Sequence, residues 1–431
     1  MSAVSTTSNV GAFTREAFEQ SLARCSHLPA WWLDRKRAAY ERFAALPMPK
    51  RTDEGWRFSN FSALTLDGFV PPTGDRRQVT RAPAFASASL SFLNNAASGR
   101  EGAAPAGVIF DTLQNALLKH GDLVKAHLLA QPSKLGSGKF AALHEAFLED
   151  GAFVYAPKGT ELAQPLAVYH LADGEGTTVF PHTLIVAEEN AKLTVTDFYG
   201  SVQGSDRQFA VGGNDLYAGH GAQLAYIALQ DWSREALSFQ FNATVAKRDA
   251  KVLSLNLHAG AKQARHESFS QLQAPGAHSE MLALTVAQGA QEFDQRTLQI
   301  HQAPHTSSNL LYKNALLDTA KTIFSGLIVV DPDAQKTDAY QSNRNLMLSD
   351  EAEAHSLPGL EIQANDVRCT HGATSARIDR EQEFYLEARG IKPAQAQQLL
   401  VFGFFEEVLA KIEHEALHDS LSEIIRRKFK K

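Results

Sequence analysis

Short runs of alternating apolar and polar residues dominate the middle of the chain. Four such runs are residues 153–155, 166–169, 183–186 and 192–196, and tight polar turns separate them. An alternation with a period of two is typical of β-strands, because successive side chains point to opposite faces of a sheet. The pattern therefore predicts a β-rich core that begins at about residue 151.

A weak internal repeat runs through this region. Small or polar turn residues precede an alanine and then a strand at Ala191, Ala222, Ala250 and Ala277. The spacing of roughly 27 to 31 residues suits one coil of a β-solenoid. Strands this short cannot each close a core, and stacked coils would bury every rung against the next. A β-sandwich also shows short alternating strands with frequent turns, so it remains the alternative at this point.

The amino-terminal part of the chain has a helical pattern. Thr14 is a good helix N-cap, and a second helix from about Trp31 should end at Pro47. We expect three further short helices, at residues 111–120, 122–130 and 139–148. The sequence thus divides into a helical region with loops at residues 1–150 and a β core at residues 151–390.

A second helical region follows at residues 391–431. Pro393 suits the first turn of a helix that we expect to continue to about Ala416. Ser420 and Glu423 have the spacing of a capping box, so we expect a last helix to begin there. The aromatic residues of this region would pack on their own domain or offer a surface to a partner.

Composition and charge narrow the functional classes. The 431 residues carry a net charge of −6, which argues against a general nucleic-acid binder. Two cysteines are too few for a disulfide framework and favour a reducing compartment. The segment Met1–Ala12 lacks the pattern of a secretory signal, and the apolar run Leu399–Phe405 is too short to span a membrane. We therefore expect a cytoplasmic protein.

Several motifs resemble those of a known family. The most specific lie in the last third of the chain, at Ser325-Gly326, in TDAYQSNRNLMLS at 337–349, in PGLEI at 358–362, in NDVRCTHGAT at 365–374 and in FYL at 384–386. The segments EGWR at 54–57, ALHEAF at 142–147 and DGAFV at 150–154 agree with them. Together these segments resemble the SufB/SufD family of iron–sulfur cluster assembly scaffolds, and the EGWR segment and the Cys-Thr-His-Gly motif are more similar to the SufD branch.

The resemblance implies a fold and a set of partners. It implies a right-handed parallel β-helix between helical ends, in a scaffold that is not itself an enzyme. It also implies pairing with SufB, binding of the ATPase SufC through the C-terminal helices, and an indirect link to a cysteine desulfurase system. A homodimer could form in isolation. Flavin has been associated with the assembled family complex, but no residue of this sequence locates it.

Cys369 and His371 are the candidate ligands for iron or a nascent cluster. On a strand, residues two apart project from the same face, so the thiol and the imidazole would point together. A soft thiolate beside an imidazole suits ferrous iron. Two ligands are too few for a closed site, so the others would come from a partner subunit. The resemblance implies that His371 faces a cysteine of SufB across their interface.

Two other histidine patterns carry a weaker signal. The segment His414-Glu415-Ala416-Leu417-His418 matches the H-E-x-x-H signature of zinc proteases, but position 424 is an isoleucine and little chain follows. We interpret this match as a coincidence on a solvated helix. His301 and His305 are also four apart, but Pro304 lies between them, so we expect a turn there.

The remaining candidates concern partners and alternatives. Phe402, Phe404, Phe405 and Val408 are the candidate SufC-docking residues of the C-terminal helices. The segment Asn343-Arg344-Asn345 could satisfy turn backbones at one edge of the solenoid or contact the partner subunit, and we favour the structural role. No phosphate-binding loop is visible, so ATP hydrolysis would belong to another protein. The rival function is a carbohydrate-active β-helix lyase or hydrolase, but no recurring carboxylates line the candidate rungs.

Overall fold

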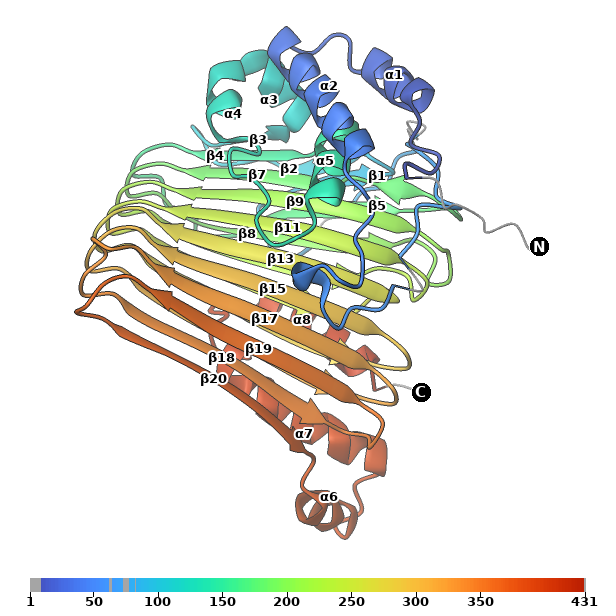
Figure 1. Cartoon of the computed structure of the whole chain (residues 1–431), viewed down its shortest axis with the longest axis vertical. Coiled ribbons are helices and arrows are strands. Elements are labelled where there is room, and N and C mark those ends of the chain that lie inside the picture. Colours follow the sequence, from blue (N-terminus) through green and yellow to red (C-terminus); the bar gives the residue numbers. More distant parts are fainter. Residues whose placement is uncertain (1–8, 62–63, 73–76, 82, 430–431) are drawn as a thin grey trace.

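Two β-sheets form most of the molecule (Figure 1). The computed structural model describes residues 9–61, 64–72, 77–81 and 83–429. Within these residues the first sheet has ten strands in the order β2-β1-β5-β8-β10-β12-β14-β16-β18-β20. Their bounds are β1 Ala88–Leu93, β2 Ala96–Gly102, β5 Leu166–Ala172, β8 Lys192–Ser201, β10 Gln223–Asp231, β12 Lys251–His258, β14 His278–Ala287, β16 Ser307–Leu316, β18 Asp338–Met347 and β20 Arg368–Arg377.

The second sheet lies opposite the first. Its strands follow the order β19-β17-β15-β13-β11-β9-β7-β4-β3, with the short β6 paired to β9. Their bounds are β3 Ile109–Thr112, β4 Ala152–Ala156, β6 Thr178–Val179, β7 His182–Ala187, β9 Phe209–Ala218, β11 Leu237–Ala246, β13 Gln263–Leu272, β15 Glu292–His301, β17 Lys321–Val330 and β19 Glu353–Ile362.

From β7 onward, successive strands belong alternately to the two sheets, and each strand pairs with the next strand of its own sheet. One strand from each sheet makes up one rung of the stack. Neighbouring strands are parallel from β4 and β5 onward, and among the strands of the described residues only the pairs β1–β2 and β3–β4 are antiparallel. This parallel register excludes the β-sandwich and gives a β-solenoid of about 8 turns between helical ends, which confirms the predicted fold class. The interior carries stacked apolar side chains such as Leu193, Leu224 and Val252, which are in register and buried.

One edge of the solenoid is a ladder of left-handed turns. The turn residues Asn190, Gly221, Asp249 and Gly276 all have positive φ, between 54° and 77°. The amide of each donates a hydrogen bond to a carbonyl of the next coil, as from Asn190 to His220. The alanine that follows each turn residue is completely buried. The repeat seen in the sequence is therefore one corner of the solenoid, where Asn, Asp and Gly tolerate the left-handed conformation.

The amino-terminal helices cover the outer face of the second sheet (Figure 1). Their bounds are α1 Arg15–Arg24, α2 Ala30–Ala45, α3 Leu113–Lys119, α4 Gly121–His127 and α5 Gly138–Phe147, with a 3₁₀ turn at Glu54–Trp56. Thr14 caps α1 as predicted, because its hydroxyl accepts a hydrogen bond from the Ala17 amide. The strands β1–β3 also belong to this part of the chain and join it to both sheets.

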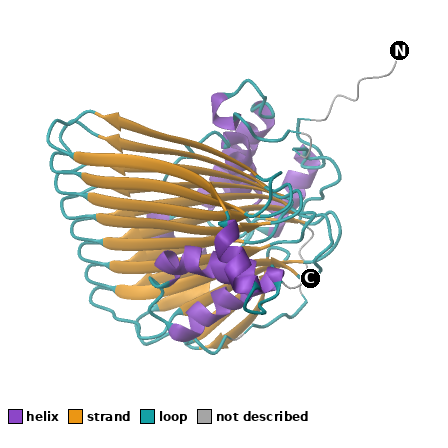
Figure 2. Ribbon diagram, turned by 90° about the horizontal axis from the view of Figure 1, so that it is seen from below, coloured by secondary structure: helices purple, strands orange, loops and turns teal. Residues whose placement is uncertain are grey.

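Two of the carboxy-terminal helices, α7 Pro393–Leu409 and α8 Glu415–Arg427, lie against the first sheet (Figure 2). The helix before them, α6 Arg380–Glu387, has no buried side chain. The predicted boundaries were wrong here, because α7 ends seven residues before Ala416 and α8 begins at Glu415 instead of Ser420. Ser420 lies inside α8, and its hydroxyl donates to the Ala416 carbonyl. In the described part of the chain, no helix is long and apolar enough to cross a membrane.

Candidate functional site at the open end of the solenoid

The strands β19 and β20 end the two sheets at the same end of the solenoid (Figure 1). Each pairs on one side only, β19 with β17 and β20 with β18, within the residues that the structure describes. The backbone amides and carbonyls on the outer side of both strands are thus available to another chain. Such free edges are templates for pairing with a further strand.

Cys369 and His371 lie on β20 and face the interior of the solenoid at this end. The register places Cys369 beside Ala339 and His371 beside Gln341, two buried inward-facing residues of β18. Because no rung follows β20 in the described structure, the imidazole of His371 is exposed and Cys369 is half-buried. The structure therefore brings the two predicted residues onto one face, as the two-residue spacing indicated.

The thiol of Cys369 has an apolar surrounding. It packs at the edge of a cluster that contains Ile328, Val330, Ala339 and Leu360. Burial raises the pKa of this thiol, and the carboxylate of Asp338 raises it further. The isolated chain thus holds a neutral thiol, and coordination of a metal ion would have to displace its proton.

A polar layer lies beneath the pair. Asn343 and Asn345 point inward and are buried, and the Asn345 amide donates to Ser356 of β19 and Ser375 of β20 at 3.2 Å each. Arg344 points outward and lies 3.1 Å from the Glu407 carboxylate of α7. The Asn345 contacts join both edge strands to the penultimate rung, so the segment has a structural role. It lies within β18, however, and not at the turns where we expected it.

The other histidines do not join this pair. His301 is buried in β15, where its ring nitrogens lie 2.7 Å from Thr306 Oγ1 and 2.8 Å from Ser308 Oγ. His305 occupies one of the left-handed turns, with φ of 57°. His414 precedes α8, and His418 lies within it beside Asp419. Across the described residues, no three His, Cys, Asp or Glu side chains are arranged to hold a metal ion.

The candidate docking residues of α7 divide into two sets. Phe405 and Val408 are completely buried against the first sheet, and Phe402 and Phe404 are half-buried beside them. Phe405 and Val408 therefore attach α7 to its own solenoid and are not accessible to a partner, which corrects their assignment as contact residues. The exposed apolar side chains of this region are instead Leu399 of α7 and Phe384 and Tyr385 of α6, which are 52%, 71% and 56% exposed.

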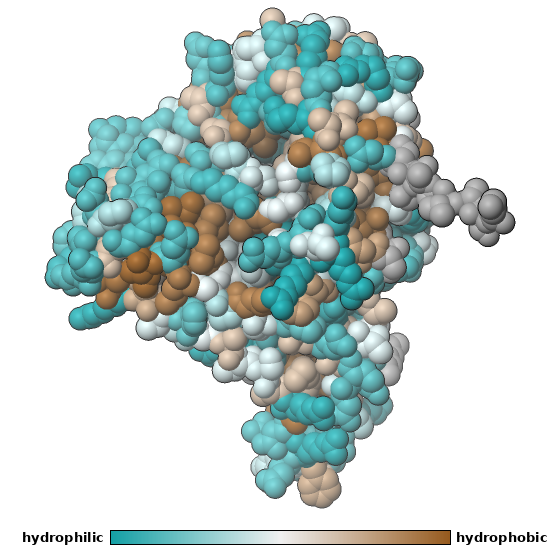
Figure 3. All heavy atoms as spheres, in the orientation of Figure 1, coloured by the Kyte–Doolittle hydropathy of each residue, from teal (hydrophilic) through white to brown (hydrophobic). Residues whose placement is uncertain are grey.

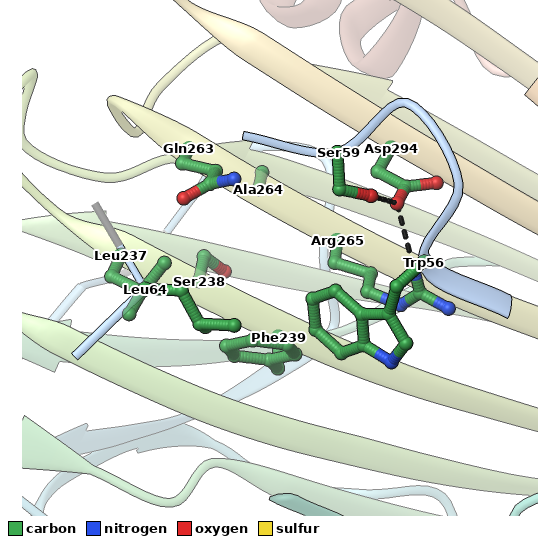
Figure 4. A pocket seen from close by; sticks show the side chains of 10 residues that line it. All are labelled: Trp56, Ser59, Leu64, Leu237, Ser238, Phe239, Gln263, Ala264, Arg265 and Asp294. Carbon is green, nitrogen blue, oxygen red and sulfur yellow. Dashed lines mark hydrogen bonds and ion pairs between the residues drawn. The ribbon is translucent and has the colours of Figure 1, made fainter. Parts of the chain in front are cut away.

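Sequence reasoning missed a second feature, a strap that crosses the outer face of the second sheet (Figure 4). The strap consists of residues 51–61, and its Trp56 ring lies 4.1 Å from the guanidinium of the buried Arg265. Arg265 also pairs with Asp294 at 2.5 Å, and Asp294 accepts a hydrogen bond from Ser59. The signal was present as charged residues at alternate positions of two adjacent rungs. These side chains satisfy one another's charges and hydrogen bonds, and the cavity that remains between them is only about 10 Å³. We therefore assign them to fixing the strap on the sheet and not to binding a ligand.

Comparisons with known proteins agree with this architecture. The family description "SUF system FeS cluster assembly, SufBD core domain" matches residues 170–404, and "SufBD protein N-terminal region" matches residues 83–168. The chain is 28% identical to iron–sulfur cluster assembly protein SufD of Bacillus subtilis over 93% of this chain and 95% of that protein. It is 28% identical to SufD of Escherichia coli over 86% of each chain, and 23% identical to SufB of Bacillus subtilis over 93% of this chain and 90% of that one. The chain therefore belongs to the SufBD family of iron–sulfur cluster assembly proteins, and within it the chain is SufD-like.

Proposed function

We propose that the chain is a non-catalytic scaffold subunit that pairs with SufB through its open solenoid end. One observation carries this proposal. In the described residues, both sheets end there in strands that are paired on one side only, β19 and β20, and Cys369 and His371 face the interior. A second solenoid that extended the two sheets would cover the pair and supply the missing ligands.

The pair would serve iron or a nascent cluster at the subunit interface. Thiolate and imidazole are both ligands of ferrous iron, and iron is cargo in this role and not a resident cofactor. Two groups leave at least two coordination positions to the partner. Sharing the site between subunits makes it transient, because separating the solenoids would break the ligand set.

The C-terminal helices would bind the ATPase SufC. The exposed Phe384, Tyr385 and Leu399 form an apolar surface on α6 and α7, and α6 projects away from the solenoid (Figure 1). Closure of the ATPase would then be transmitted to the proposed SufB interface through α7, whose Glu407 pairs with Arg344 of β18. The free energy of ATP binding and hydrolysis would act by shifting the population between two packings of that interface.

Replacement of His371 tests the proposed site. His371→Ala should impair cluster formation by the reconstituted complex while leaving its assembly with SufB intact, since the side chain is exposed and supports no packing. Thr370→Ala is the matched control, because Thr370 is an exposed neighbour on the opposite face of β20. Normal cluster yield with His371→Ala would refute the ligand role. Failure of the wild-type chain to bind SufB would refute the scaffold assignment.

A further inference from the structure

The strap, residues 51–61, is held on the second sheet mainly through its backbone. Four of its carbonyl oxygens accept hydrogen bonds from side chains of the sheet at 2.7 to 3.2 Å, namely those of Gly55, Arg57, Phe58 and Asn60. The Asn60 amide donates to the Glu292 carboxylate at 2.9 Å. The donor side chains are Gln263 and Arg265 of β13, Arg296 of β15 and Lys321 of β17. Residues 55–60 are therefore bound by groups that the backbone of another peptide would satisfy equally.

Two side chains of the strap are buried in contacts with the rest of the chain (Figure 4). Trp56 is 3% exposed, its ring lies 4.1 Å from the Arg265 guanidinium, and its indole nitrogen donates to the Gly136 carbonyl at 3.1 Å. The Ser59 hydroxyl donates to the Asp294 carboxylate at 2.6 Å. In peptide recognition, backbone hydrogen bonds supply affinity and pockets for a few side chains supply specificity. The strap meets this description, with Trp56 as its buried anchor.

The surface beneath the strap is charged, and its charges are balanced without the strap. The acidic and basic side chains of the sheet pair with one another at 2.5 to 3.8 Å: Arg265 with Glu267 and Asp294, Arg296 with Asp294, and Lys321 with Glu292. None of these ion pairs is lost when the strap leaves, and water can replace its hydrogen bonds. Within residues 55–60, Trp56 is the one apolar side chain that is buried. The strap can therefore detach without exposing a large apolar surface.

The bound strap is also strained. Phe58 has φ of 72°, a left-handed conformation that is costly for a residue with a bulky side chain. The carbonyl groups of Arg57 and Phe58, on either side of this residue's Cα atom, both accept hydrogen bonds from the sheet. Detachment would free Phe58 to return to a favoured conformation, so the strain opposes the attachment that the hydrogen bonds provide. A segment held by polar contacts against strain is suited to reversible release.

We propose that the outer face of β13, β15 and β17 is a peptide-binding site, which the strap occupies in cis. When the strap detaches, the site takes a segment of a partner protein with the same chemistry. Such a segment is a short peptide that carries a tryptophan and, three residues later, a hydroxyl side chain, as Trp56 and Ser59 do. While the strap is in place, the remaining cavity of about 10 Å³ has no room for it. The strap is thus an autoinhibitory segment that the partner must displace.

The covalent link of the strap to the site sets the condition for displacement. A segment on a short flexible link has an effective concentration on the order of millimolar at its own site. A free peptide at micromolar concentration therefore does not displace the strap. A partner that is already docked elsewhere on the molecule presents its segment with a comparable advantage, so the site opens to docked partners and stays closed to free peptides.

Hydrogen exchange of the full wild-type chain tests the release of the strap. The amides of Trp56, Arg57, Ser59 and Asn60 are hydrogen-bonded in the bound strap. We expect them to exchange together and at least about a hundredfold faster than the central amides of β13 and β15, because the strap opens without the sheet. Exchange of the strap amides only at the rate of the sheet amides would mean that the strap leaves when the solenoid unfolds. That result would overturn the proposal.

A peptide added in trans tests the site itself. Trp56→Ala in the full chain removes the anchor of the strap and leaves the sheet unchanged. A fluorescein-labelled synthetic peptide of residues 51–61 should bind this variant at least about tenfold more tightly than the wild-type chain, as measured by fluorescence anisotropy. The same peptide carrying Trp56→Ala is the control and should bind neither chain.

Two results of the peptide experiment would overturn the proposal. One is equal binding of the unmodified peptide to the folded variant and to the wild-type chain, and the other is equal binding of the two peptides to the variant. Circular dichroism shows whether Trp56→Ala retains the β structure of the wild type. If it does not, the exchange experiment decides the proposal, because it uses the wild-type chain alone.

Discussion

Phe58 stacks on His355, with the ring centroids 4.7 Å apart and the planes only 7° from parallel. Phe58 belongs to the strap and His355 to β19, so the N-terminal part of the chain contacts the last rung of the solenoid. Phe58 has φ of 72°, a left-handed conformation that is rare for a bulky residue, and its carbonyl accepts a hydrogen bond from Lys321. A strained residue held by several contacts indicates that the strap is fixed here and that it steadies the edge at which we propose SufB to bind.

Replacement of Phe58 should therefore loosen β19. Phe58→Ala should lower the free energy of unfolding by about 1 kcal/mol through loss of the ring stack. Phe58→Gly also removes the ring but accepts the positive φ, so it should be more stable than Phe58→Ala by roughly 0.5–1 kcal/mol. Urea unfolding gives both values, and hydrogen exchange of residues 353–362 should increase in both variants. Unchanged exchange in β19 would show that the strap does not support the last rung.

Asp197 should make stability depend on pH. Burial raises the pKa of this carboxyl group to about 6, although Tyr226, Tyr199 and Thr183 donate hydrogen bonds to it. The folded chain therefore holds this proton more tightly than the unfolded chain, whose aspartates titrate near the model-peptide value of about 3.9. The contribution of Asp197 to the free energy of unfolding is therefore fully present below about pH 3.9, the pKa in the unfolded chain. It is lost as the pH rises through about 6, and the loss is at most about 3 kcal/mol.

The variant Asp197→Asn isolates this contribution. Urea unfolding between pH 4 and pH 7 should show a flatter profile for Asp197→Asn than for the wild-type chain. Asp366→Asn is the control, because Asp366 is exposed and pairs with Lys336 at the surface, and it should keep the wild-type slope. A slope for Asp197→Asn that equals the wild-type slope would contradict the assignment to this carboxyl group.

The periodicity of the sequence predicted the β core and favoured a solenoid, but it left the β-sandwich open and gave no information on the surface. Alternation placed the strands, and the turn residues before Ala191, Ala222, Ala250 and Ala277 marked one corner, because local sterics decide both features. The two-residue spacing likewise placed Cys369 and His371 on one face. That their face is open follows from β20 being the last rung, which is a property of the whole stack.

The features that sequence reasoning missed depend on contacts between distant segments. Nothing local to Trp56 indicates that it meets Arg265, some two hundred residues away, and the contact of His144 with His182 requires α5 to lie across the second sheet. The same limit explains the error at Phe405. An apolar helix face looks the same in sequence whether its own sheet or a partner covers it.

Gly326 should be intolerant of a side chain. A Cβ atom there would lie 2.5 Å from Gln341 Oε1 and 2.7 Å from both Phe324 Cζ and Thr297 Oγ1, all inside the solenoid. Gly326→Ala should thus cost about 1–3 kcal/mol of unfolding free energy, since the interior must move to accept it. Gly372→Ala is the matched control on β20, where nothing lies within 4 Å of the added atom. Comparable stability of the two variants in urea unfolding would mean that the rungs next to β19 and β20 can move to accommodate the added methyl group.

The exposed side chains of α6 and α7 should govern binding of SufC. Phe384→Ser combined with Tyr385→Ser removes two large apolar surfaces that contribute no buried side chain to the fold, so the chain should unfold as the wild type does. Loss of two such groups from an interface typically costs more than 2 kcal/mol, which weakens binding at least about thirtyfold. Calorimetric titration with purified SufC measures this loss. Phe405→Ala provides the contrast. Phe405 is buried between α7 and the first sheet, so its replacement should lower the thermal stability of the chain. Wild-type affinity of the double variant for SufC would show that SufC does not dock on α6. Unchanged thermal stability of Phe405→Ala would contradict the role of that residue in holding α7 to the sheet.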